Sequence, residues 1–142
     1  MALPRAVLLD TCALIWLAEG KLAAPALEAL QHAAEGEGVF VSPVSAWEIG
    51  LISRSSRGSR RVQFLPDPQA WFADIVRRPE IREVPLSWNS ALAASSLPEP
   101  LHGDPADRLL IATAREINAV LATGDRDIIA YGKAGHVAVL PC

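Results

Sequence analysis

The chain has 142 residues, 51% of them apolar and 20% charged, with a formal net charge of −3, which is the composition of one folded globular domain. The acidic balance excludes a protein that binds nucleic acid through net positive charge alone, and two cysteines are too few for a disulfide framework or for paired zinc ligands. We expect no signal peptide and no membrane segment, and therefore a cytoplasmic protein, because Asp10 interrupts the apolar N-terminal run and a spanning helix needs about 20 apolar residues.

Apolar runs typical of buried strands alternate with segments of helical periodicity in the first half of the chain. Ser42 and Pro43 provide an N-cap and a first-turn proline for one of these helices. This half predicts strands at Ala6–Leu9 and Val39–Val41, and helices at Ala13–Glu19, Pro25–Glu35 and from Val44 to about Ser53.

The second half continues the alternation. Asp67-Pro68 and Asp104-Pro105 each open a helix with a cap and a proline. The remaining pattern predicts helices at Ser87–Ser95, Ala106–Ile117 and Asp125–Tyr131, and strands at Ile81–Val84, Ala119–Ala122 and His136–Val139. Such alternation implies an α/β fold over residues 1–142: a single domain of three layers, α/β/α, with a mainly parallel central sheet flanked by helices.

Three acids follow strands or begin helices, where sites form in such sheets. Asp10 directly follows the first strand, and Asp125 follows the strand Ala119–Ala122 with two residues between. Asp107 lies near the start of a helix whose N-terminus should point to the same rim. Thr11 and Thr123, each beside one of these acids, are predicted to orient a carboxylate or a water.

Glu48 is the fourth candidate. On the helix from Val44 it shares one face with Val44, Leu51 and Ile52, so it interrupts an apolar surface. A buried carboxylate needs an arginine, a shared proton or a cation to compensate it. Four acids on one rim repel each other, and a divalent metal relieves that repulsion. Oxygen ligands favour Mg²⁺ or Mn²⁺, and such a site supports phosphodiester hydrolysis.

Each acid also has a purely structural explanation. Asp104 is expected as a helix N-cap, and Asp107 suits the helix dipole. Asp125 and Asp127 fit a turn in Thr-Gly-Asp-Arg-Asp, and the structural alternative for Glu48 is an ion pair with an arginine.

Other groups stay open between structural and functional interpretations. The arginines at 54, 57, 60 and 61 fit either a solvated loop or a loop that contacts phosphate or a partner. Trp47, Trp71 and Trp88 are predicted in the core. The helix around Trp16 is apolar nearly all round, so part of it is a candidate contact with another chain. His102 is a weak candidate for supporting the Asp104 cap or touching substrate.

Four strings, LLDTCALIWL, VFVSPVSAWEIGL, LHGDPADRLLIATA and VLATGDRDI, resemble the PIN domain, and more specifically the VapC-type toxins of bacterial toxin–antitoxin pairs. The resemblance covers essentially the whole chain and implies a PIN-like fold. It implies an endoribonuclease that uses Mg²⁺ or Mn²⁺ bound by Asp10, Glu48, Asp107 and Asp125, with Asp104 as a supporting acid. It further implies an RNA substrate, a homodimer, a cognate antitoxin, and promoter DNA bound only through the antitoxin complex.

Three rival functions fit less well. A receiver-type signalling domain, which also binds Mg²⁺ at strand ends, needs adjacent acids after the first strand, whereas Thr11 and Cys12 follow Asp10. An aspartyl-nucleophile phosphatase needs a second acid at position 12. A binding module with a decayed site is disfavoured because all four acids are present.

Overall fold

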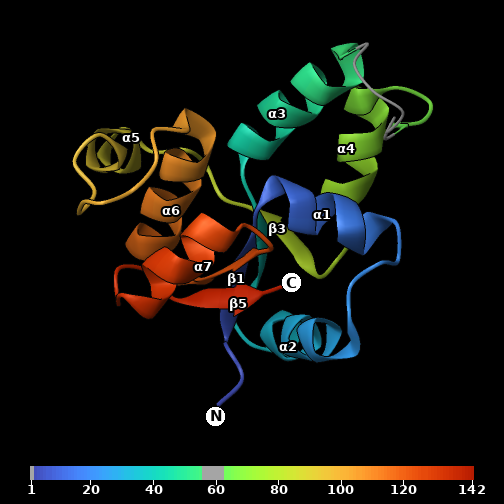
Figure 1. Cartoon of the computed structure of the whole chain (residues 1–142). Helices are drawn as coiled ribbons and strands as arrows, with labels where there is room; N and C mark the ends of the chain where they lie inside the picture. The colour runs from blue at the N-terminus through green and yellow to red at the C-terminus, as the bar shows by residue number, and fades with distance from the viewer. Residues whose placement is uncertain (1, 56–62) are drawn as a thin grey trace.

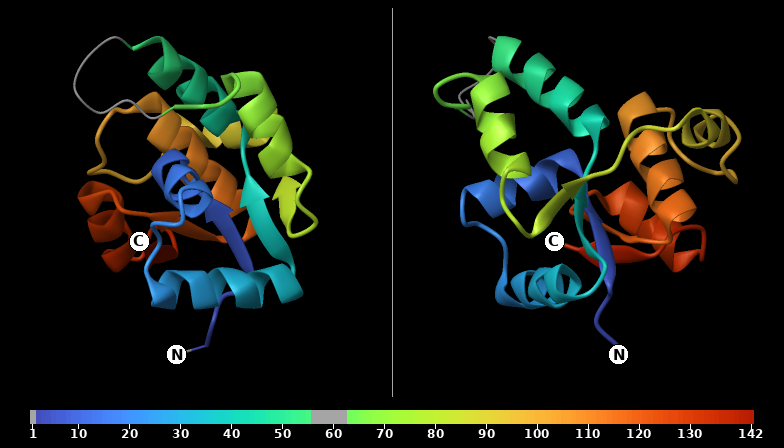
Figure 2. Two further views of the ribbon diagram at one scale, coloured as in Figure 1. Left: turned by 90° about the vertical axis from the view of Figure 1, so that its right-hand side faces the viewer. Right: turned by 180° about the vertical axis from the view of Figure 1, so that it is seen from behind.

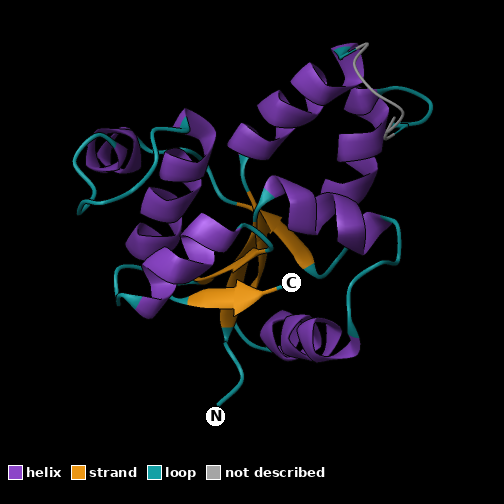
Figure 3. Ribbon diagram, viewed as in Figure 1, coloured by secondary structure: helices purple, strands orange, loops and turns teal. Residues whose placement is uncertain are grey.

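The computed structural model describes residues 2–55 and 63–142. Its centre is a parallel sheet of five strands in the order β3-β2-β1-β4-β5, drawn in orange in Figure 3. The strands are β1 (Ala6–Leu9), β2 (Gly38–Val41), β3 (Ile81–Glu83), β4 (Val120–Thr123) and β5 (Val139–Pro141). The predicted parallel sheet is confirmed.

Helices cover both faces of the sheet (Figures 1 and 2). One layer holds α1 (Thr11–Ala18), α2 (Ala24–Glu35) and α4 (Pro68–Val76), and the other holds α5 (Trp88–Ala94), α6 (Pro105–Ile117) and α7 (Arg126–Lys133). The helix α3 (Pro43–Arg54) contacts α1, α4 and α6, so it bridges the two layers. The predicted three-layer fold is confirmed.

The central strand β1 explains why two cores form. All four of its residues are buried, and successive side chains of a strand point to opposite faces. Val7 and Leu9 join the core under α1 and α2, while Ala6 and Leu8 join the core under α6. A uniformly apolar strand is therefore what a sheet covered on both faces requires.

The strand order places a topological switch point beside β1. The chain builds outward from β1 to β2 and β3, then returns to the other side of β1 as β4 and β5. Leu9 at the end of β1 pairs with Ala122 in β4. Ligands bind in open α/β sheets at this kind of crevice, outside the carboxyl ends of the strands.

Two predictions about the fold are wrong, one on the bounds of the last strand and one on the burial of two tryptophans. The last strand is Val139–Pro141, not His136–Val139, because β5 pairs with β4 only from Leu121–Val139 onward. His136 belongs instead to the turn after α7, where its backbone N–H donates to the Tyr131 carbonyl. The tryptophans Trp47 and Trp88 are 55% and 78% exposed, so they are not core residues, whereas Trp71 is partly buried and packs edge-on against Phe64.

The rest of the chain follows the sequence pattern closely. The apolar helix around Trp16 is used inside the domain, since Ala13, Leu14 and Ile15 are buried and Trp16 packs against the core. Of the four loop arginines, the three at 57, 60 and 61 lie outside the described residues, and Arg54 ends α3. No helix within 2–55 and 63–142 is long and apolar enough to cross a membrane.

Candidate active site

One pocket of about 200 Å³ opens at the switch point. It is lined by all four predicted acids, together with Thr11, Cys12, Trp16 and Gly124. Each acid comes from a different part of the fold: Asp10 follows β1, Glu48 lies in α3, Asp107 lies in α6, and Asp125 precedes α7. The structure thus brings together carboxylates that are far apart in sequence.

Asp10 is the most buried of the four, with 6% of its surface exposed. It is the N-cap of α1, and its Oδ1 accepts a hydrogen bond from the Ala13 backbone N–H at 2.7 Å. Burial raises the pKa of Asp10, and the charges of Glu48 and Asp125 raise it further, while hydrogen bonds from Thr123 and Ala13 oppose the rise. Asp10 is therefore a desolvated carboxyl held in a fixed orientation.

The Thr123 hydroxyl links two of the acids. Its side chain is fully buried and donates a hydrogen bond to the Asp10 carboxylate. The same oxygen accepts the backbone N–H of Asp125 at 3.0 Å. One hydroxyl thereby fixes the carboxylate at the end of β1 relative to the residue that begins α7.

Glu48 has a different environment from the predicted one. Val44 is buried, but Leu51 and Ile52 are 49% and 37% exposed, so the helix face shared with Glu48 is not a continuous buried surface. The reason is that α3 extends beyond the sheet edge (Figure 1), and only its first turns contact the core. The prediction that Glu48 interrupts a buried apolar helix face is therefore wrong, because Leu51 and Ile52 on that face are exposed.

Glu48 is nevertheless part of the pocket. Thr11 Oγ1 donates a hydrogen bond to Glu48 Oε1 and lies 3.0 Å from Ser45 Oγ. Among residues 2–55 and 63–142, no arginine pairs with Glu48. Burial raises the pKa of Glu48, the hydrogen bond from Thr11 lowers it, and the charge of Asp104 raises it.

Asp107 faces a histidine. Burial, followed by the charges of Asp104 and Asp125, raises the pKa of Asp107 to about 7, and His102 opposes the rise. His102 Nδ1 accepts the backbone N–H of Asp104 at 3.3 Å, which places the ring proton on Nε2. That Nε2 is buried and lies 3.4 Å from Asp107 Oδ2, a close polar contact rather than a full hydrogen bond.

The capping role predicted for Asp104 is confirmed, and Asp125, predicted as a turn residue, is the N-cap of α7. Asp104 Oδ1 accepts the Asp107 N–H at 3.0 Å. Asp125 Oδ1 accepts the N–H groups of Asp127 and Ile128 at 2.8 and 3.1 Å. In each case the cap uses one carboxylate oxygen, and the second oxygen remains for another ligand.

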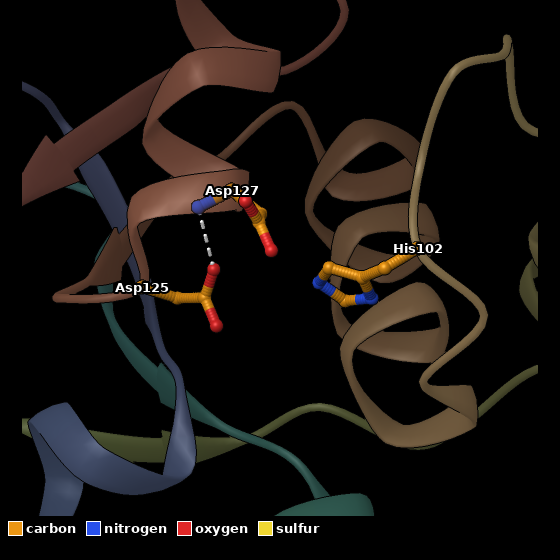
Figure 4. Close-up of side chains that lie close together, drawn as sticks. All are labelled: His102, Asp125 and Asp127. Carbon is orange, nitrogen blue, oxygen red and sulfur yellow. Dashed lines mark hydrogen bonds between the residues drawn. The ribbon is translucent and has the colours of Figure 1, made fainter.

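The tightest group of potential metal ligands is one that the sequence indicated only weakly. Within the described residues, His102, Asp125 and Asp127 form the one group of three or more such side chains whose ligand atoms all lie within 4.8 Å of one another. Figure 4 shows His102, from the loop before α6, pointing toward the two aspartates at the start of α7. The sequence could indicate this group only through the short spacing between Asp125 and Asp127. The approach of His102 to these two residues depends on tertiary structure.

The donors around the acid pocket suit a hard divalent cation. Apart from Cys12, the ionisable side chains that line it are carboxylates. The pKa of Cys12 is raised to about 11 by burial and by the four acids, so its thiol stays protonated and is a poor metal ligand. Oxygen donors favour Mg²⁺ or Mn²⁺, and Mg²⁺ keeps several waters, which suits acids spaced around a pocket. The residues present therefore fit the predicted metal.

Comparison with known proteins gives a consistent result. A family model described as PIN domain matches residues 7–134. The chain is also 34% identical, over 122 residues, to Ribonuclease VapC22 of Mycobacterium tuberculosis (strain ATCC 25618 / H37Rv). The aligned region covers 84% of this chain and 87% of that protein. The family resemblance predicted from the four sequence strings is confirmed.

Solved structures share the fold at lower identity. The crystal structure of VapBC2 from Rickettsia felis bound to a DNA fragment from their promoter matches with a TM-score of 0.66 and 15% identity, covering 96% of this chain and 98% of that one. The VapBC-5 toxin–antitoxin structure from Mycobacterium tuberculosis matches with a TM-score of 0.60 and 18% identity, covering 98% and 100%.

Proposed function

The chain belongs to the PIN-domain family, and from this premise we propose that it is the ribonuclease toxin of a toxin–antitoxin pair, hydrolysing RNA phosphodiester bonds with Mg²⁺ or Mn²⁺. The observation that carries the proposal is the pocket lined by Asp10, Glu48, Asp107 and Asp125. A relative that covers most of the chain and is named a ribonuclease supports RNA as the substrate.

The metal would be held by the four acids of the pocket. When bound, such an ion activates water and stabilises the charge that develops on the attacked phosphate. The protein's own contribution is to hold its oxygens in place before substrate arrives. Thr123 fixes Asp10, and Thr11 fixes Glu48, while the N-terminal ends of α1, α6 and α7 stabilise negative charge through their dipoles.

His102 and Asp104 support this arrangement from the side of α6. The Asp104 backbone N–H fixes the ring of His102, and the ring directs its Nε2 proton to Asp107. Partners of this kind orient the carboxylates that hold a metal. Asp104 itself caps α6 and adds negative charge near Glu48 and Asp107.

The partner in the proposal is a cognate antitoxin. Structures of toxin–antitoxin complexes, one of them bound to promoter DNA, share the fold. Trp47, Leu51 and Ile52 expose apolar surface on the same helix as Glu48, so a protein that covers this surface also lies beside the pocket. A homodimer, promoter DNA bound through the antitoxin complex, and residence in the cytoplasm complete the proposal.

The direct test is RNA cleavage by the purified chain, free of any partner. We expect cleavage with Mg²⁺ or Mn²⁺, its arrest by EDTA, and its loss in Asp10→Asn. Asp74→Asn, which removes an exposed carboxylate from a surface ion pair, is the matched control and should cut normally. Full activity of Asp10→Asn, or activity in EDTA, contradicts the proposed site.

The toxin–antitoxin part has a separate test. Expression of the chain alone should arrest growth, and co-expression with the neighbouring open reading frame should relieve the arrest. Growth arrest that no adjacent gene relieves contradicts this part of the proposal, and leaves the nuclease assay unaffected.

A further inference from the structure

A second cavity, of about 400 Å³, adjoins the acid pocket. Its lining includes Leu101, His102, Asp127, Ala130, Tyr131 and His136. Two of these, His102 and Asp127, have ligand atoms within 4.8 Å of Asp125, which itself lines the acid pocket. The acid pocket and this cavity are therefore neighbours, with Asp125 lining the first and Asp127 lining the second.

The cavity combines the half-buried imidazole of His136, backed by the buried ring of Tyr131, with one carboxylate. The rings of Tyr131 and His136 pack with their centroids 4.6 Å apart and an interplanar angle of 35°. The Tyr131 hydroxyl donates to the Pro98 carbonyl at 2.7 Å, which fixes the ring and satisfies its polar atom. Asp127 is exposed at the start of α7, where its carboxylate offers acceptors and no donor.

The volume of the cavity and the chemistry of its lining indicate which kind of molecule it binds. About 400 Å³ lies within the range of roughly 300–1,000 Å³ typical of small-molecule sites, which are mostly apolar with a few convergent polar groups. A phosphate is disfavoured because Asp127 repels it. A flat, neutral group that stacks on the His136 ring and donates N–H hydrogen bonds is favoured, and a nucleobase has both properties.

We propose that this cavity is the subsite for one nucleobase of the RNA, next to the phosphate held at the acids, and that it prefers guanine. The inference rests on the proposed ribonuclease function. Guanine presents two N–H groups side by side, which match the two oxygens of one carboxylate. Uracil presents a single N–H between two carbonyls, which the Asp127 carboxylate repels.

Two variants and a control test the subsite. Ala130→Phe fills the cavity from the exposed side of α7, and Asp127→Asn replaces one acceptor oxygen with a donor. Ala91→Phe places the same ring on an exposed position of α5, outside the cavity lining. We expect the wild type and Ala91→Phe to cut a library of randomised short RNAs with guanine favoured at one position beside the cut. Ala130→Phe and Asp127→Asn should lose that preference.

Binding provides a readout independent of cleavage. Fluorescence anisotropy with 2′-O-methyl tetranucleotides, with Ca²⁺ in place of the catalytic metal, should show guanine-containing strands binding at least about fivefold more tightly than their uracil counterparts, as expected when a bidentate hydrogen-bonded pair is lost. Ala130→Phe should abolish the difference. An unchanged cleavage pattern in both variants, or equal binding of the two strands by the wild type, overturns the inference.

Failure of the subsite and failure of the proposed function remain distinguishable. If the wild type cuts no RNA, the proposed function fails, and the binding comparison alone decides the subsite. If Asp127→Asn keeps the cleavage pattern but weakens Mn²⁺ binding, Asp127 is a metal ligand and the base subsite is wrong.

Discussion

Replacement of Asp107 by asparagine should stabilise the metal-free protein while it removes RNA cleavage. Asparagine has nearly the shape of a protonated aspartic acid but cannot ionise. In the wild type, burial and the neighbouring charges of Asp104 and Asp125 raise the pKa of Asp107 to about 7. The folded protein therefore resists ionisation of this group, and the unfolded chain does not.

The size and sign of the effect follow from linkage. Because the folded pKa lies above the ordinary value of 3.8, the wild type loses stability as the pH rises from about 4 to about 7, and the loss is complete above that range. At about 1.36 kcal/mol per pH unit, the difference amounts to about 4 kcal/mol. Native domains have total stabilities of about 5–15 kcal/mol, so this is a large share.

Urea denaturation in EDTA at a series of pH values measures the effect. Asp107→Asn should match the wild type near pH 4 and exceed its free energy of unfolding by about 4 kcal/mol at pH 8. Asp74→Asn should follow the wild type, since an exposed ion pair contributes about 0–1 kcal/mol. Mn²⁺ at about 100 times its Kd should then stabilise the wild type by about 2.7 kcal/mol and Asp107→Asn by much less.

A stability difference between Asp107→Asn and the wild type that is the same at pH 4 and pH 8 would contradict a raised pKa of Asp107. Such a result would mean that the pocket does not oppose ionisation of Asp107. The repulsion between acids would then give no reason for a cation.

Three further substitutions test how the site is supported. Thr123→Val removes the hydroxyl that links two acids and should weaken Mn²⁺ binding, measured by calorimetry, about 10- to 100-fold; an unchanged Kd would contradict the linking role. His102→Gln should weaken Mn²⁺ binding in the same range, whereas His32→Gln, at a residue bonded to the Pro4 carbonyl, should leave it unaltered. Gly124→Ala would place a Cβ 2.7 Å from the Trp16 ring and should lower thermal stability by about 1–3 kcal/mol; Gly50→Ala, in open space on α3, should raise it by about 0.5–1 kcal/mol.

Local rules were sufficient to predict the positions of three acids. Asp10 and Asp125 lie where parallel strands end, and Asp107 begins a helix, so strand order alone brings them to one rim. Caps and prolines likewise predicted the starts of α3, α4 and α6. These features depend on neighbours within a few residues, which is why the sequence contains them.

Features that depend on distant parts of the chain were not predicted. Trp47, Trp88 and Leu51 are apolar residues in predicted helices, but the sequence pattern does not distinguish a core position from one that faces solvent. The approach of His102 to Asp125 and Asp127 requires the loop before α6 to lie against the start of α7. The predicted bounds of β5 were wrong because pairing with β4, rather than the apolar pattern, determines where that strand begins.

The strand order also determines when the site exists during synthesis. The strand that leads to Asp10 lies between β2, which is translated early, and β4, which is translated late. A chain still on the ribosome, with its N-terminal part made first, can carry Asp10 and Glu48 without the segment that supplies Asp125. We expect products of early termination that lack β4 and α7 to cut no RNA, whatever else of the sheet they form. On the proposed function, the centre that cuts RNA is completed only after β4 and the start of α7 have been synthesised.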